Sequence, residues 1–358
     1  MSTTRKVSRT VTSIIVAVLM LALAGVITYV SLNLFKSNDS IFVSDSDTYT
    51  LTQEYVLSND DVKATNGSDK VVTLNKPVTM DLGGYALDLN GFTLKIASET
   101  EGALVTIKNG TVKNGVLDIS VPNGDIEFDT AVIAETVDYE LEAASQTIRF
   151  SNVTSSGKGT VKSDTHIQIS YSEMADISLA GNGSLEAGEG TKLGKLSVSQ
   201  SAAGAKVVIS PTAKVTSLAI QAKADVNIAG TVEDVEVKAV AKVAVTGEVK
   251  KVSVTAEATS ETESAEISIA PTAVVDNVDL KAKTTLDVQG VVSNVVVGAS
   301  ATGTKVSVSG DHATAGRVVV SAEDTVLETE NADAIQNVLV SSEVASKVEI
   351  RGPNILVA

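Results

Sequence analysis

The stretch Thr231–Gly247, TVEDVEVKAVAKVAVTG, places its apolar side chains in an order that recurs in the chain. The segments Val274–Gly290, VVDNVDLKAKTTLDVQG, and Lys214–Gly230, KVTSLAIQAKADVNIAG, follow the same order. In each copy one apolar residue is followed three positions later by another, and then by a mostly apolar or small residue at every second position. A period of two predicts a β-strand, and repetition of a 17-residue unit predicts coils stacked on one another.

We therefore expect an all-β protein, a single-stranded parallel β-helix (β-solenoid), with coils of about 17 residues in the C-terminal half. One longer coil of 26 residues, Glu248–Ala273, is expected among them. Crossovers between parallel strands are right-handed by a strong rule, so we expect a right-handed coil, and a left-handed coil is the alternative. Asn-Gly pairs at Asn90, Asn109 and Asn114 fit the tight corners of such a coil, because both residues accept positive φ.

Composition divides the chain into five parts. Residues 1–10 are a basic tail expected in the cytoplasm, 11–35 a transmembrane signal-anchor, and 36–69 a linker with an N-terminal cap for the solenoid. Residues 70–190 form its N-terminal part, with longer and irregular coils, and residues 191–358 its C-terminal part, with regular coils.

The segment Val11–Phe35 carries no charge over 25 residues. As a helix it would extend over roughly 37 Å, more than the ~30 Å hydrocarbon core of a bilayer. Arg5, Lys6 and Arg9 precede it, so the positive-inside rule predicts a single-pass cell-membrane protein with a cytoplasmic N-terminus and an extracellular body. A signal peptide cleaved after Ala22-Leu23-Ala24, which would release a secreted protein, is the alternative.

Charge and composition argue against several classes of function. The formal net charge is −16, which opposes binding to the phosphates of nucleic acid. Cysteine is absent, and the two histidines, His166 and His312, are far apart in the sequence. Zinc sites and Ser-His-Asp catalysis are therefore not expected, and we predict neither a metal nor a cofactor.

The run Asp81–Ile96, DLGGYALDLNGFTLKI, followed by Leu104–Ile119, LVTIKNGTVKNGVLDI, resembles the right-handed parallel β-helix proteins of the pectate-lyase-like superfamily. The similarity covers roughly residues 70–170. The resemblance implies the fold, and it allows two kinds of function, because the superfamily includes polysaccharide-cleaving enzymes and non-catalytic bacterial cell-surface proteins.

A polysaccharide lyase or glycoside hydrolase would need outward carboxylates on one wall together with a basic residue. Strand parity places several acidic side chains and Arg149 outward, and the catalytic candidates are Asp88, Asp118, Glu127 and Arg149. The alternative is that these charged side chains have no catalytic role and are simply the solvated outer surface of the walls. Four aromatic residues are candidate stacking platforms for sugars, whereas Phe128 and Phe150 are expected in the core; the four are Tyr85, Phe92, Tyr139 and Tyr171.

Three functions remain open. The first is a membrane-anchored extracellular β-solenoid with a non-catalytic structural or adhesive role at the bacterial cell surface, in contact with cell-envelope or host polysaccharide. The second is a carbohydrate-active enzyme of the β-helix fold. The third is an envelope scaffold that polymerises by end-to-end self-association of its coils.

Overall fold

The computed structural model describes residues 40–43, 46–143, 147–162, 164–255, 263–353 and 355. The chain divides into two units, Met1–Asp45 and Ser46–Ala358. In the first unit the described residues include the short 3-10 helix η1 (Ile41–Val43). The predicted basic tail and the predicted membrane segment Val11–Phe35 lie outside the described residues. Within the described ranges, the structure contains no helix with the length and apolar character needed to cross a bilayer.

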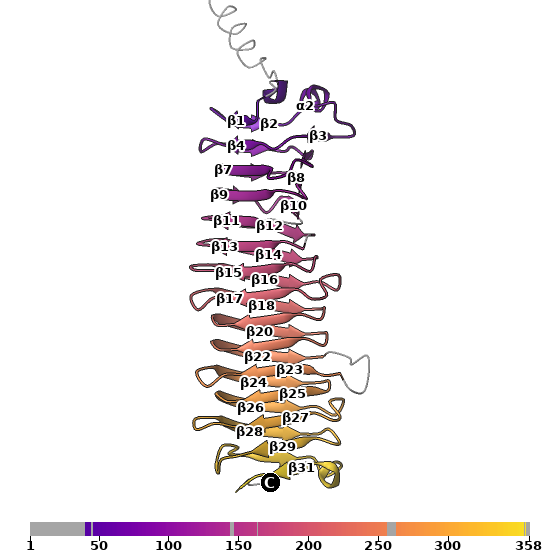
Figure 1. Cartoon of the computed structure of the whole chain (residues 1–358), viewed down its shortest axis with the longest axis vertical. Helices are drawn as coiled ribbons and strands as arrows, with labels where there is room; N and C mark the ends of the chain where they lie inside the picture. The colour runs from indigo at the N-terminus through magenta and orange to yellow at the C-terminus, as the bar shows by residue number, and fades with distance from the viewer. Residues whose placement is uncertain are drawn as a thin grey trace, which may run out of the picture. The chain divides into compact units, whose positions relative to one another are not determined.

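The second unit is a parallel β-solenoid, as predicted (Figure 1). Its described strands, β1 to β31, form one continuous sheet that winds through about 13 turns. The strands pair in parallel with strands of neighbouring coils, and the pairings fall into three columns, here called walls A, B and C. The hand of the coil stays a prediction.

Wall A is the column of strands that opens each coil. Its members are β1 (Thr48–Thr50), β4 (Thr79–Asp81), the first half of β7 (Leu104–Lys113), the first half of β9 (Asp125–Ile133), β11 (Thr147–Ser151), β13 (His166–Ser170), β15 (Ser184–Ala187), β17 (Lys206–Ile209), β19 (Asp225–Ile228), β21 (Lys242–Val245), β23 (Ala265–Ile269), β25 (Thr284–Val288), β27 (Lys305–Val308), β29 (Val326–Thr329) and β31 (Glu349–Arg351).

Wall B follows wall A around the coil. It contains β2 (Tyr55–Val56), β5 (Ala86–Asp88), the second halves of β7 and β9, and the first parts of β12 (Thr154–Val161), β14 (Glu173–Leu179), β16 (Lys192–Val198), β18 (Lys214–Ile220), β20 (Thr231–Val237), β22 (Glu248–Val254), β24 (Val274–Leu280), β26 (Val291–Val297) and β28 (Thr314–Val320).

Wall C closes each coil. It contains the second parts of the long strands β12 to β28 of wall B, together with β3 (Val71–Leu74), β6 (Thr93–Ala97), β8 (Gly115–Ser120), β10 (Val137–Glu142) and β30 (Val338–Val340). Two short helices flank the walls, α2 (Asn59–Ala64) before β3 and the 3-10 helix η2 (Ala345–Lys347) before β31. Strands β1 and β2 and helix α2 lie within the interval predicted as linker and cap.

The three-position step in the repeat marks a bend in the long strands. In β20, Val232, Val235 and Val237 are buried, while the two residues between the first pair, Glu233 and Asp234, are both exposed. Two successive outward residues turn the strand through a corner and bring the next side chain back to the core. The bend therefore separates wall B from wall C, and each coil has three sides.

The predicted coil length is right for only part of the C-terminal half. Val215 pairs with Val232, Val232 with Val249, and Val275 with Val292, which gives coils of 17 residues. Val249 pairs with Val275, 26 residues on, which confirms the one longer coil expected here. The mean over the solenoid is about 21 residues. The difference lies in corner loops, which lengthen without disturbing the walls because chain closure depends weakly on loop length.

The core consists of columns of like side chains. Phe128 and Phe150 occupy neighbouring coils in wall A, and their rings stack with centroids 5.1 Å apart and planes 5° apart. Tyr139 lies 6.3 Å from Phe150 and is also buried. The prediction that Phe128 and Phe150 belong to the core is confirmed.

We expect Phe150→Ala to lower the free energy of unfolding by about 3–5 kcal/mol, because it removes the partner of two buried rings. Val208→Ala, at a side chain 40% exposed on wall A, should change it by less than about 1 kcal/mol. Urea unfolding of the full-length chain measures both. Equal effects of the two substitutions would contradict the stacked core.

Candidate functional site

The four predicted catalytic residues lie on three different walls. Asp88 is in β5 on wall B, Asp118 in β8 on wall C, and Glu127 and Arg149 in β9 and β11 on wall A. Arg149 is paired in register with Glu127, so the structure brings these two together. It does not bring Asp88 or Asp118 to them, because the core separates the walls.

The prediction of outward carboxylates is confirmed. In β9, Asp125, Glu127 and Asp129 alternate with the buried side chains of Ile126 and Phe128. Asp118 faces outward and lies 3.7 Å from the Nζ atom of Lys95 on the preceding coil. These carboxylates therefore form part of the solvated surfaces of walls A and C.

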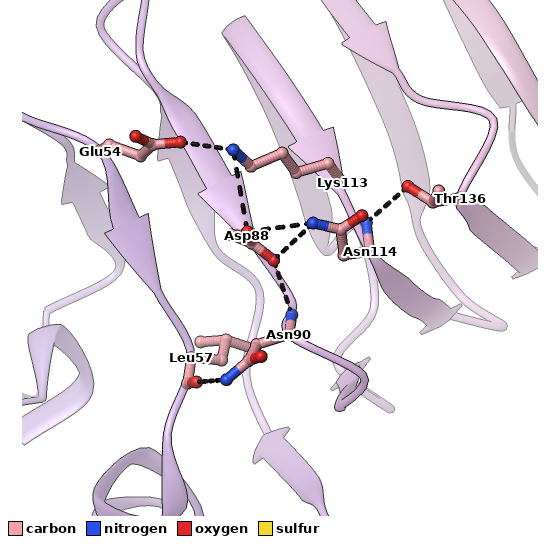
Figure 2. A network of polar contacts seen from close by, with 7 residues as sticks. All are labelled: Glu54, Leu57, Asp88, Asn90, Lys113, Asn114 and Thr136. Atoms are coloured by element: carbon pink, nitrogen blue, oxygen red, sulfur yellow. Dashed lines mark hydrogen bonds and ion pairs between the residues drawn. The ribbon is translucent and has the colours of Figure 1, made fainter.

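Asp88 is held by a network of polar contacts, the Asp88 cluster (Figure 2). Its Oδ1 atom accepts hydrogen bonds from the backbone N–H of Asn90 at 2.8 Å and from the side-chain amide of Asn114 at 3.0 Å. The same amide lies 3.0 Å from Oδ2, and Nζ of Lys113 lies 3.7 Å from that oxygen. Both carboxylate oxygens are therefore engaged by the fold.

The cluster also ties the first coils together. Lys113 hydrogen-bonds Glu54, and this bond together with the charge of Asp88 raises the pKa of Lys113. The side-chain amide of Asn90 donates to the carbonyl of Leu57 at 3.1 Å (Figure 2). The Asp88 cluster thus links three successive coils, which is a structural role that sequence parity alone does not reveal.

A second cluster repeats this chemistry one corner earlier. The sequence DLGGY at Asp81 matches DLNGF at Asp88, and in the next coil KNG at Lys108 matches KNG at Lys113. Asp81 accepts hydrogen bonds from the side chain of Asn109 at 3.1 Å and from the N–H of Gly83 at 3.1 Å. The motif that carries the resemblance is therefore a pair of corner clusters.

The Asn-Gly pairs in these clusters occupy corners, as predicted. Asn109 and Asn114 have φ of 59° and 62°, in the left-handed region. A Cβ atom at Gly115 would lie 2.4 Å from the carbonyl oxygen of Phe92, so only glycine allows the two coils to approach this closely.

Two of the four aromatic candidates are wrong as sugar platforms. Phe92 and Tyr139 are buried, and burial raises the pKa of the Tyr139 hydroxyl. Strand parity should have placed Tyr139 inward, between Val137 and Leu141. Tyr85 and Tyr171 are exposed, with 42% and 57% of their surface accessible.

Tyr171 has an unusual backbone conformation. Its φ is 49°, which is strained for a bulky residue, whereas the corresponding corners of the three preceding coils have the smaller residues Asn109, Thr130 and Asn152 in that region. A Cβ atom at Gly190, on the next coil, would lie 2.8 Å from the ring of Tyr171. The ring therefore lies across the corner between walls A and B, and a hydrogen bond to Glu189 raises its pKa.

A shallow groove of about 380 Å³ lies on wall B beside this corner, across strands β12 to β20. It is hollow because Ser156, Ala175 and Gly194 supply small or absent side chains on three successive coils. A Cβ atom at Gly194 would lie 2.6 Å from the carbonyl oxygen of Ala175, so the position needs glycine. Glu173, Lys192, Lys214 and Glu233 provide the charged lining.

Both lysines that line this groove come from one lysine-rich run of the sequence. The run from Thr191 to Ala224 contains five lysines and no acidic residue, in a chain of net charge −16. Lys192 lies 3.5 Å from Glu173, whereas Lys214 has no ion pair within the part of the chain that the structure describes. This run was visible in the sequence, and its missing acidic residues were the signal.

The groove is suited to binding polar groups. Lysine can meet carboxylates, the two glutamates can accept hydrogen bonds from hydroxyl groups, and Tyr171 offers an aromatic ring beside them. Among the described residues, no group of three or more His, Asp or Glu side chains is arranged to hold a metal ion.

No protein-family model matches the chain, and no match was found among curated proteins or solved structures. The structure therefore shows a parallel β-solenoid, and the resemblance to the pectate-lyase-like superfamily stays a prediction.

We expect Asp88→Ala to lower the free energy of unfolding by about 1–3 kcal/mol, because it leaves the donors of Asn90 and Asn114 without their acceptor. Glu127→Ala, also at an outward carboxylate, should stay within about 0.5 kcal/mol of the original chain. Urea unfolding of the full-length variants compares them. A neutral Asp88→Ala would contradict the structural role of this carboxylate.

The Asp81 carboxylate should make the stability of the fold depend on pH in the acid range. The hydrogen bonds from Asn109 and Gly83, with Lys108 nearby, hold the pKa of Asp81 below its usual range. This carboxylate therefore stabilises the fold above the unfolded value of about 3.9, and the contribution is lost as the pH falls through the lower folded pKa. Urea midpoints measured from about pH 6 to pH 2 should fall less steeply for Asp81→Asn. Identical acid profiles would argue against this cluster.

Proposed function

We propose that the chain is a membrane-anchored extracellular β-solenoid with a non-catalytic, structural or adhesive role at the bacterial cell surface. The observation that carries the proposal is the position of the candidate carboxylates. Asp88 has both oxygens engaged by the fold, and Asp118 and Glu127 lie on other walls. A lyase or hydrolase would need such groups to converge on one sugar.

The N-terminal segment supports the location. Val11–Phe35 is long enough to span a bilayer and follows Arg5, Lys6 and Arg9. Cleavage after Ala24, with release of the body, is the alternative. Brief protease treatment of intact cells should remove the solenoid body while the N-terminal tail stays protected, and protection of both parts would contradict an extracellular body.

The partner that fits best is a polysaccharide of the cell envelope or of a host, bound along the groove of wall B. The groove crosses successive coils, which are spaced about 4.8 Å apart, so it can follow an extended chain. The exposed ring of Tyr171 and the charged lining would contact sugar rings and their hydroxyl or carboxylate groups.

A carbohydrate-active enzyme is the second candidate, and the register of Glu127 and Arg149 on wall A is the observation that favours it. Incubation of the full-length chain with polygalacturonate and calcium separates the two functions. The non-catalytic role predicts that the polymer keeps its length. Shortening of the polymer that is lost in Arg149→Ala would instead support the enzyme.

Binding is tested by affinity electrophoresis of the full-length chain through gels that contain polygalacturonate. We expect Lys214→Glu to reduce retardation at least roughly threefold, because it reverses the unpaired charge of the groove. Lys206→Glu is the matched control, since Lys206 belongs to the same lysine-rich run but lies on wall A. Equal loss in both variants would show nonspecific attraction and would contradict a role for the groove.

A further inference from the structure

A row of charges of both signs lies on the outer face of wall C, along the edge where the bend from wall B ends. Asp176, Lys195, Ser217, Asp234 and Lys251 occupy the same position on five successive coils and are paired in register. Each is exposed or half-buried at the surface. We call these five residues the charge row.

The four charged members of the row have no oppositely charged partner in contact within the described part of the chain. None of them takes part in an ion pair among the residues that the structure describes. Elsewhere on the solenoid comparable neighbours are paired, such as Lys250 with Glu233 at 2.7 Å and Lys242 with Glu266 at 3.1 Å. The charge row therefore offers free ionic groups at regular spacing.

The order of signs in the row is self-complementary under a two-fold rotation. Consider a second copy that faces wall C in the antiparallel direction, with the two-fold axis in the interface at Ser217 and perpendicular to the stacking direction. Lys195 then lies opposite the second copy's Asp234, and Asp176 lies opposite its Lys251. The coil repeat is the same in both copies, so the spacings match.

The match continues beyond the five residues. The next positions outward are Lys158 on one side and Asn277 on the other, followed by Asp138 and Asn294. The rotation places Lys158 opposite Asn277 and Asp138 opposite Asn294. No like charges meet anywhere along the row, and an isologous interface of this kind is the commonest way for identical chains to pair.

The neighbouring row of wall C allows a close approach. Its outward side chains at the same coils are mostly small: Ser178, Ser197, Ala219 and Ser253. The exception, Glu236, is held 2.8 Å from Lys238 and would lie opposite Ser197 of the second copy. Two sheet faces with such side chains can pack at about the usual 10 Å separation.

We propose that wall C is a self-association surface, on which a second copy of this chain binds antiparallel through the charge row. A uniformly charged polymer would meet a like charge at two of the five coils, whereas a second copy meets the opposite sign at each charged position. The inference does not depend on the proposed function, and it differs from end-to-end stacking because the coil ends remain free.

The experiment uses the full-length chain in mild detergent, with sedimentation velocity to measure its oligomeric state. We expect a dimer that dissociates as salt is raised. An all-acidic row, Lys195→Glu with Lys251→Glu, and an all-basic row, Asp176→Lys with Asp234→Lys, should each weaken the dimer by roughly tenfold or more. An equal mixture of the two should form a heterodimer, because every opposed pair is again of opposite sign.

The mixture separates this interface from a role of the charges within one chain. If the row only stabilised its own coils, both variants would unfold more easily and mixing would restore nothing. The matched control is Lys206→Glu with Lys242→Glu on wall A, which should leave the dimer unchanged. A monomeric original chain at low salt, failure of the mixture to associate, or equal weakening by the control would each overturn the proposal.

Discussion

The structure depends on parallel, in-register pairing between successive coils. Each coil forms its backbone hydrogen bonds with its neighbours and places its inward side chains on like side chains, so that Val215 lies against Val232 and Val232 against Val249. A single coil fixes many residues and buries only a few aliphatic groups, and it therefore cannot be stable alone. The three walls, the corner bends and the regular rows on the surface all follow from this stacking.

The same stacking decides what the outward residues can do. It places residues about 20 positions apart next to each other, and it separates residues on different walls by the core. Asp88 and Asn114 meet and form a corner cluster, whereas Asp88 and Glu127 do not meet. Small side chains at one position on consecutive coils produce the groove on wall B, and charges of both signs at one position produce the charge row on wall C.

Much of the fold could be predicted from the sequence, because the period of two and the three-position step record which side chains face the core. The bend at Glu233 and Asp234 and the burial of Phe128 and Phe150 follow from that pattern. Coil length was predicted less well, since corner loops vary without affecting the period. The candidate sites are harder to predict from the sequence than the fold. The partners of Asp88 come from neighbouring coils, and the groove is recognised only when residues on successive coils of unequal length are aligned. Tyr139, which we predict as a sugar platform, is buried because its parity in the strand points inward.

The register itself can be measured with introduced cysteines, because the chain has none of its own. Asn227 and Ala244 are neighbours on adjacent coils of wall A, and Ser268 lies one coil further on. Mild oxidation should form an intramolecular disulfide in Asn227→Cys with Ala244→Cys. It should form none in Asn227→Cys with Ser268→Cys, since two coils separate those positions by about 9.6 Å, beyond the reach of a disulfide. A bridge in the second pair, or none in the first, would contradict the stacked solenoid.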